Sequence, residues 1–180
     1  GPAAPPVLGL RAVGGAHGRV ECVVIDGLLR VGVVWLAVAA ALSGGMVLTF
    51  SNFVVRALDR LTEAEAVRAM QSINETVINP LFLFVFIGTG LIALLLSGAH
   101  FLAATASPWL HVGTGLYLVG LVGVTAVGNV PLNESLATVD PTTTTGSWAN
   151  FREPWMAWNH LRTLAAVCAA AAFVLAAGQG

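Results

Sequence analysis

The sequence predicts an all-α fold: a transmembrane four-helix bundle with an amphipathic surface helix between spans one and two. The first observation is composition, because 57% of the 180 residues are hydrophobic and only 9% are charged. Soluble domains carry roughly 25% charged residues. This chain therefore cannot cover a water-soluble surface, and lipid must cover much of it. The second observation is that long runs without charged residues alternate with short polar segments.

We divide the chain into an N-terminal tail, 1–30, and a four-helix membrane domain, 31–180. Gly1 and Pro2 resemble the scar that a tag-removing protease leaves, so they are excluded from the fold prediction. All eight basic residues are arginines, which excludes a Schiff-base lysine and a Walker-type phosphate site. The net charge of -1 provides no basic surface, and we expect no nucleic-acid partner.

The first span is predicted at 31–55, where 25 residues contain no charged side chain. A helix rises about 1.5 Å per residue, so this run is long enough to cross a hydrocarbon core of about 30 Å. Arg30 and Arg56 bracket it. Their charges are expected to mark the two ends of the span.

The segment 56–75 mixes both signs of charge and predicts an amphipathic helix at the membrane surface. Thr62 followed by Glu65 fits a capping box, in which each side chain bonds the other residue's backbone. Apolar residues recur at helical spacing and predict one packed stripe: Met70, Ile73 and Val77. Three acidic side chains are expected to form a solvated face: Asp59, Glu63 and Glu65.

The remaining spans follow from one long uncharged stretch and one Ala-rich stretch. Residues 76–133 contain no charged side chain, which is enough for two spans. Ser107-Pro108 divides them, because proline disfavours helical geometry in the preceding residue. We expect spans at 81–103 and 109–130, packed antiparallel. After a polar loop, 133–154, Pro154 suits the first turn of a helix, and the fourth span is expected at 163–180.

Alternation of the four spans places several polar clusters on one membrane side, here called the site face. Along the entry to the fourth span, polar and aromatic residues recur at i, i+3, i+4 and i+7: Trp155, Trp158, Asn159 and Arg162. They share one side of a helix. Unpaired polar groups in hydrocarbon cost several kcal/mol, so we predict a polar pocket beneath the surface helix. The alternative is that each of these residues is a hydrated interfacial anchor.

Four motifs occur in order: MQSIN at 70–74, NPLF at 79–82, GNVPLN at 128–133 and W-x-x-W-N-H-L-R at 155–162. In these motifs the chain resembles the anthrone-oxygenase-like family of small four-span membrane proteins, most of whose bacterial members have no assigned function. The resemblance covers roughly 31–177. It implies the four-span fold. It also implies oxidation of an anthrone to an anthraquinone by O₂ without a conventional cofactor.

Such chemistry requires an apolar slot, a base and donors for the developing oxyanion. His160 is the base that chemistry favours, because its ordinary pKa lies near neutrality. Its adjacency to Asn159 turns it about 100° away on the helix, so it is also compatible with facing the headgroups. The candidate catalytic residues are His160, Arg162 and Asn159. The candidate substrate-binding residues are Asn52, Asn74, Asn129, Asn133, Trp155 and Trp158.

Two other functions stay open. The chain is also compatible with a non-catalytic membrane module that binds a lipid-like ligand or a partner protein. His100 and His111 end span two and begin span three on the opposite face, where facing histidines would suit a haem or a metal. A transporter is the weakest candidate, because no charged residue is expected in the middle of a span.

The expected partners are the lipid bilayer, O₂ and an apolar aromatic small molecule. We expect an integral membrane protein of the bacterial inner membrane. Five arginines lie toward the site face and favour a cytoplasmic position for it by the positive-inside rule: Arg56, Arg60, Arg68, Arg152 and Arg162. The sequence determines neither the substrate's identity nor the oligomeric state.

Overall fold

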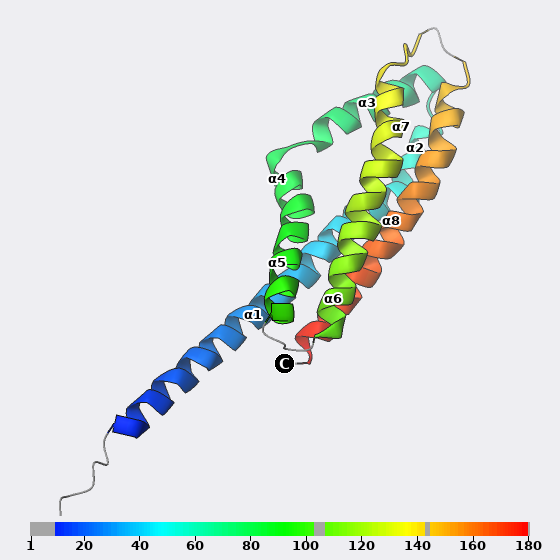
Figure 1. Ribbon diagram of the computed structural model, residues 1–180. Helices are drawn as coiled ribbons and strands as arrows, with labels where there is room; N and C mark the ends of the chain where they lie inside the picture. Colours follow the sequence, from blue (N-terminus) through cyan, green and yellow to red (C-terminus); the bar gives the residue numbers. More distant parts are fainter. Residues whose placement is uncertain (1–9, 103–106, 143–144, 180) are drawn as a thin grey trace, which may run out of the picture.

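A computed structural model describes residues 10–102, 107–142 and 145–179, with backbone alone for residues 10–26. In these described residues, four helices are long and apolar enough to cross a membrane: Gly27–Leu58, Pro80–Leu102, Pro108–Ala137 and Ser147–Ala177. All the secondary-structure elements of the described residues are helices, and the helices assemble as a bundle (Figure 1). The predicted fold class is confirmed.

Each of the first three spans contains a π-helical stretch. The first span is α1 (Leu10–Thr49), η1 (Phe50–Val54) and α2 (Val55–Leu58). The surface helix α3 (Glu63–Val77) follows. The second span is α4 (Pro80–Leu83), η2 (Phe84–Gly88) and α5 (Thr89–Leu102). The third is α6 (Pro108–Gly115), η3 (Leu116–Gly123), η4 (Thr125–Asn129) and α7 (Val130–Ala137), and the fourth is the single helix α8 (Ser147–Ala177).

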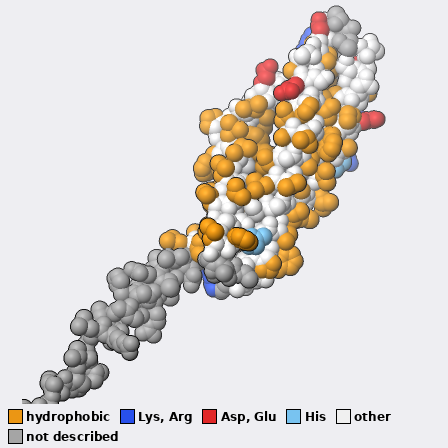
Figure 2. Space-filling model, in the orientation of Figure 1, with side chains coloured by type: hydrophobic (Ala, Val, Ile, Leu, Met, Phe, Trp, Pro, Cys, Tyr) orange, Lys and Arg blue, Asp and Glu red, His pale blue; other side chains and the backbone are white. Residues whose placement is uncertain are grey.

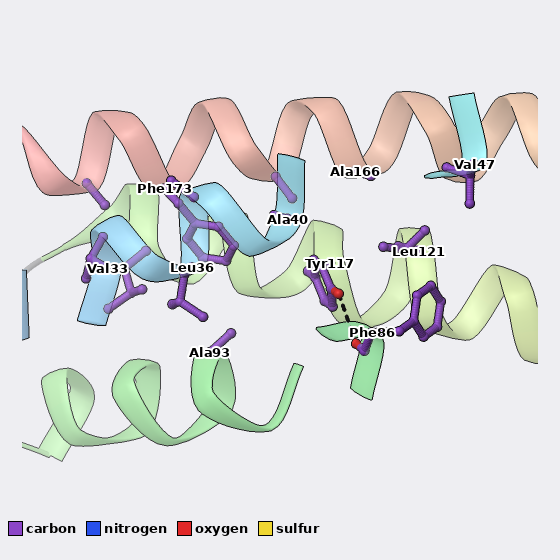
Figure 3. Packing of buried hydrophobic residues seen from close by; sticks show 14 residues of the cluster. Val33, Leu36, Ala40, Val47, Phe86, Ala93, Tyr117, Leu121, Ala166 and Phe173 are labelled. Atoms are coloured by element: carbon purple, nitrogen blue, oxygen red, sulfur yellow. Dashed lines mark hydrogen bonds between the residues drawn. The ribbon is translucent and has the colours of Figure 1, made fainter. Parts of the chain in front are cut away.

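The core of the bundle lies between α1, α5, η3 and α8, where Leu36, Tyr117 and Phe173 are fully buried (Figure 3). The Tyr117 hydroxyl donates to the carbonyl oxygen of Phe86 at 2.9 Å, so its polar tip is satisfied inside the bundle. Small residues permit the close approach of α8, and a Cβ added at Gly120 would lie 2.5 Å from Ala165 Cβ.

Large apolar side chains also cover much of the outer surface (Figure 2). Leu95 and Leu102 on the second span and Val119 on the third are exposed by more than two thirds. Exposed apolar side chains on helices long enough to cross a membrane are consistent with contact with lipid. The acidic side chains on the visible face gather near one end of the bundle, around α3 and the start of α8 (Figure 2).

The surface helix α3 is firmly docked on the site-face end of the bundle. Thr62 and Glu65 form the predicted capping box. Met70 and Val67 are buried in a second apolar cluster with Leu136 and Trp155. The Gln71 amide donates to two backbone carbonyl oxygens at the end of the third span, those of Leu136 and Val139, at 2.9 and 3.0 Å.

Asp59 is exposed and Glu63 is half-buried, so both stay partly solvated as expected, but each also bonds the start of α8. Asp59 accepts from the indole N–H of Trp148 at 2.8 Å and pairs with Arg152 at 2.9 Å. Glu63 accepts from the backbone N–H of Trp148 at 3.1 Å. The first N–H groups of a helix have no partner within it, and an acidic side chain supplies one. These carboxylates therefore tie α8 to α2 and α3.

The boundaries of several elements differ from the prediction. Residues 56–58 belong to the end of span one, so the surface helix begins at Glu63. The third span continues to Ala137, and α8 begins at Ser147 with Pro154 inside it. Proline removes one helical hydrogen bond, but Phe151 and Trp155 are buried on either side of it and hold the helix in place. Helix α1 begins at Leu10, within the segment assigned to the tail.

Glu63 makes the docking of α3 on α8 sensitive to acid. The backbone N–H groups of Gly146 and Trp148 hold the pKa of this carboxyl below its ordinary value of 4.5. A lowered pKa means that Glu63 stabilises the docked state above pH 4.5 and loses this effect as the pH falls through the lowered value. We expect the protection factors of the backbone amides at 146–148, which are corrected for the intrinsic pH dependence of exchange, to fall in acid and to be low at all pH values in Glu63→Gln. Glu134→Gln, at an exposed site on α7, is the control and should behave as the parent chain; equal exchange in both variants would contradict this prediction.

Candidate functional site

Arg162 lies at the middle of α8 and is 8% exposed, inside a helix that crosses the membrane. The sequence prediction had placed it just before the fourth span. The expectation that no charged residue lies in the middle of a span is therefore wrong at Arg162. No carboxylate lies within 4.0 Å of its guanidinium among the described residues. Ionisable residues within membrane helices are costly and usually functional, so Arg162 is the starting point for the site.

Neutral groups surround the guanidinium. The Asn159 side-chain oxygen accepts from Arg162 Nε at 3.0 Å and from Nη2 at 2.8 Å. The Thr125 hydroxyl lies 3.4 Å from Nη1. The Trp155 ring faces the cation, with its centroid 5.0 Å from Cζ, in the geometry of a cation–π contact. A guanidinium has five N–H groups, so these bonds leave some of them free for a ligand.

Asn159 fixes the position of Arg162 relative to the first span. It is fully buried, and its amide group donates to the Val47 carbonyl at 2.9 Å and to the Ser51 hydroxyl at 2.6 Å. Its oxygen is taken up by Arg162. One asparagine therefore joins α1, η1 and the cation, and all its polar groups are used.

Asn129 and Asn133 reach the same cluster from the third span. The Asn129 amide donates to the Trp155 carbonyl at 3.2 Å, and Asn133 accepts from the Trp155 indole N–H at 2.8 Å. Asn129 is fully buried, yet its side-chain oxygen has no hydrogen-bond partner. A buried acceptor without a partner costs about 1–3 kcal/mol. The cluster thus combines free donors on Arg162 with a free acceptor on Asn129.

Two π-helical segments meet at this cluster. Ser51 lies in η1, whereas Thr125 and Asn129 lie in η4. The wider π turn is rare and is found frequently at functional sites. Here both π-helical segments, η1 and η4, pack against α8. They carry the polar side chains that face the cluster.

The structure brings together five of the predicted site residues: Asn129, Asn133, Trp155, Asn159 and Arg162. It does not bring in the others. His160 and Asn52 are exposed, and Trp158 is 37% exposed with its ring against Gly128. Asn74 is partly exposed on α3, although its side-chain nitrogen is buried without a partner. That a substrate-sized pocket lies beside Arg162 stays a prediction.

Sequence reasoning missed Thr125 and left Ser51 out of the candidate site. Thr125, Asn129 and Asn133 recur at i, i+4 and i+8 on an otherwise apolar span. This spacing puts them on one face of a helix. This spacing could have predicted that Thr125 belongs to the site.

The histidines of the opposite face lie apart from this cluster. His111 Nδ1 is hydrogen-bonded to the Ser97 hydroxyl. In the described part of the chain, no group of three or more His, Cys, Asp or Glu side chains is placed to hold a metal ion. A haem or metal at His100 and His111 stays an untested alternative.

Fold and site together define a class: a four-span integral membrane protein with an arginine buried among amides and an indole inside one span. The family model described as anthrone oxygenase matches residues 76–172, more than half of the chain, and the chain belongs to the anthrone oxygenase family. The match covers the second and third spans and most of the fourth, including all five clustered residues. No curated protein and no solved structure matches the chain.

Proposed function

We propose that this protein is a membrane oxygenase that converts an anthrone-like aromatic molecule to the corresponding quinone with O₂. The observation that carries the proposal is the buried Arg162, which has no carboxylate partner among the described residues. Burying a charge without a counter-charge is expensive. An anionic ligand or intermediate would offset this cost. Membership of the anthrone oxygenase family suggests that this anion is derived from an anthrone.

An anthrone becomes anionic when its ring methylene loses a proton, because the carbonyl oxygen then carries the negative charge. In the proposal this oxygen accepts hydrogen bonds from the free N–H groups of Arg162. The positive charge stabilises the enolate and lowers the pKa of the bound substrate. The Asn129 oxygen is available to accept a hydrogen bond from a hydroxyl on the same ligand.

The overall reaction consumes one O₂ and releases one water. The enolate carbon donates its electron pair to O₂, and a C–O bond forms to give a peroxide anion. Protonation of this anion gives a hydroperoxide. Loss of the remaining C–H proton with cleavage of the O–O bond forms the second carbonyl and releases water. The ring carbon is oxidised, O₂ is reduced, and the substrate itself supplies the electrons.

His160 is not part of the proposed mechanism, because its side chain is exposed while its neighbour Asn159 is fully buried. The methylene proton is proposed to pass to solvent water and to return from water to the peroxide. We therefore expect His160→Gln to retain kcat/KM within about two- to threefold of the parent chain. General-base catalysis typically contributes 10²–10⁴-fold, so a loss of that size would contradict this assignment and restore His160 as the base.

The proposed function is tested with detergent-purified protein. Anthrone is added without O₂, air is then admitted, and quinone formation is followed by its absorbance together with O₂ uptake. We expect quinone and consumed O₂ in a one-to-one ratio, at a rate above that with heat-denatured protein. Saturable anthrone binding without turnover would instead indicate the non-catalytic binding module. A Soret band in the protein spectrum would direct attention to His100 and His111.

A further inference from the structure

A hollow lies away from Arg162, where the end of α7 approaches the start of α8. Its volume is about 210 Å³. Apolar side chains form part of its lining: Leu132, Leu136, Val139 and Phe151. Three polar side chains also line it: Ser135, Ser147 and Asn150. The conjunction of an apolar wall with a few convergent polar groups is typical of small-molecule sites.

The three polar side chains of this hollow are accessible from outside, because Ser135 and Asn150 are exposed and Ser147 is half-buried. They make no side-chain hydrogen bond within the described part of the protein. Two hydroxyls and one amide supply both donors and acceptors. Among the described residues, no charged side chain lines the hollow, so its known lining does not favour a phosphate or another ion. The chemistry fits a neutral ligand that carries a hydroxyl or carbonyl group.

The apolar lining residues and the volume indicate the rest of the ligand. A cavity of about 150 Å³ lined by apolar side chains holds benzene, so about 210 Å³ admits a substituted aromatic ring. The Phe151 ring lines the hollow, and its centroid lies 5.8 Å from that of Trp148 and 6.1 Å from that of Trp155. Aromatic pairs at such distances are favourable. Trp155 is also the ring that faces Arg162.

We propose that this hollow is a binding site for a neutral hydroxylated aromatic ring, separate from the Arg162 cluster. Phe151, which lines the hollow, contacts Trp155, and Trp155 in turn contacts Arg162. Binding here does not depend on turnover. If the proposed oxygenase activity is correct, the hollow is a docking site for a substrate or product beside the reaction centre.

The test uses para-fluorophenol as the probe and fluorine NMR line broadening as the measurement, on the full chain in detergent. Ser135→Phe fills the hollow from α7. We expect saturable binding to the parent chain and a loss of at least about tenfold in affinity, or 1.4 kcal/mol, in Ser135→Phe. Ser72→Phe, which replaces an exposed serine on α3, is the matched control and should bind as the parent chain does.

Two more variants make the test specific. Asn150→Leu keeps an apolar wall but removes an amide, so it should reduce the preference for para-fluorophenol over fluorobenzene. Arg162→Gln should retain probe binding even where turnover is lost, which separates this site from the proposed function. Unchanged binding in Ser135→Phe, binding that disappears in Arg162→Gln, or non-saturable broadening that matches empty detergent micelles would each overturn the proposal.

Discussion

Replacing Arg162 by glutamine is expected to lower kcat/KM for anthrone oxidation by at least about 10²-fold, the effect of removing one preorganised oxyanion donor. Glutamine can still donate a hydrogen bond to the Asn159 oxygen, as Arg162 does. Asn159 should therefore keep its own bonds to Val47 and Ser51 in the first span. Lysine retains the charge but lacks the planar group that bonds Asn159 twice. The kcat/KM of Arg162→Lys should therefore lie between those of the parent chain and Arg162→Gln. The measurement is the initial rate of quinone formation against anthrone concentration.

Arg152→Gln is the matched control, because it removes an arginine from the same helix at an exposed site. Its ion pair with Asp59 is partly exposed, and surface pairs contribute little, about 0–1 kcal/mol. We expect near-parental turnover in this variant. Equal activity in Arg162→Gln and Arg152→Gln would show that the buried guanidinium does not act on the reaction. A drop in both would indicate a requirement for the whole helix rather than for one side chain.

Gly120→Ala is expected to have the largest effect on stability, because the added Cβ would lie 2.5 Å from Ala165 Cβ. The Ala165 methyl group is attached directly to the backbone of α8 and cannot rotate away, so η3 and α8 would have to move apart. Overpacking of this kind costs about 1–3 kcal/mol of unfolding free energy. The expected result is a lower midpoint of thermal or denaturant unfolding in detergent, with the helical signal of the folded state retained.

Gly115→Ala provides the control on the same span, since a Cβ there would meet nothing within 4 Å. Alanine favours helix over glycine by about 0.8–1.0 kcal/mol, so this variant should be as stable as the parent chain or more so. Adding Ala165→Gly to Gly120→Ala removes the opposing methyl group and should recover most of the loss. If the double variant is no more stable than Gly120→Ala, the close contact is not the cause.

Both experiments depend on the way α8 packs against its neighbours. One side of this helix places Ala165 against Gly120, and the same helix carries Asn159 and Arg162 into contact with η1 and η4. A shift of α8 would therefore alter the site as well as the core. For this reason the unfolding midpoint of each Arg162 variant belongs beside its rate. A rate loss at an unchanged midpoint is the result that assigns the arginine to the reaction.

Much of the fold follows from the sequence, because the physical constraints involved are local. Runs without charge long enough to cross lipid are visible as strings of residues. The capping box of Thr62 and Glu65 needs only three residues of spacing. The order of spans also places the polar segments on one side of the membrane. The prediction of four spans and a docked surface helix rested on these constraints and is confirmed.

The fourth span shows where local rules stop. Pro154 suggested a helix start, but α8 begins seven residues earlier at Ser147. The carboxylates of Asp59 and Glu63 bond the first turns of α8 from a distant part of the chain. These partners lie about 85 to 93 residues away in sequence. No pattern within the 147–154 segment reveals them.

Composition and local patterns are sufficient to predict the class of this protein, its spans and the group of polar residues from which a site could be built. Which of these polar residues face one another depends on packing between the helices. His160 and Asn159 are neighbours in the chain, yet one is exposed and the other is fully buried against Val47 and Ser51. A helix turns about 100° at each residue. The rotation of α8 against η1 and η4, fixed by side-chain packing across the bundle, therefore selects Arg162 for the interior and leaves His160 outside.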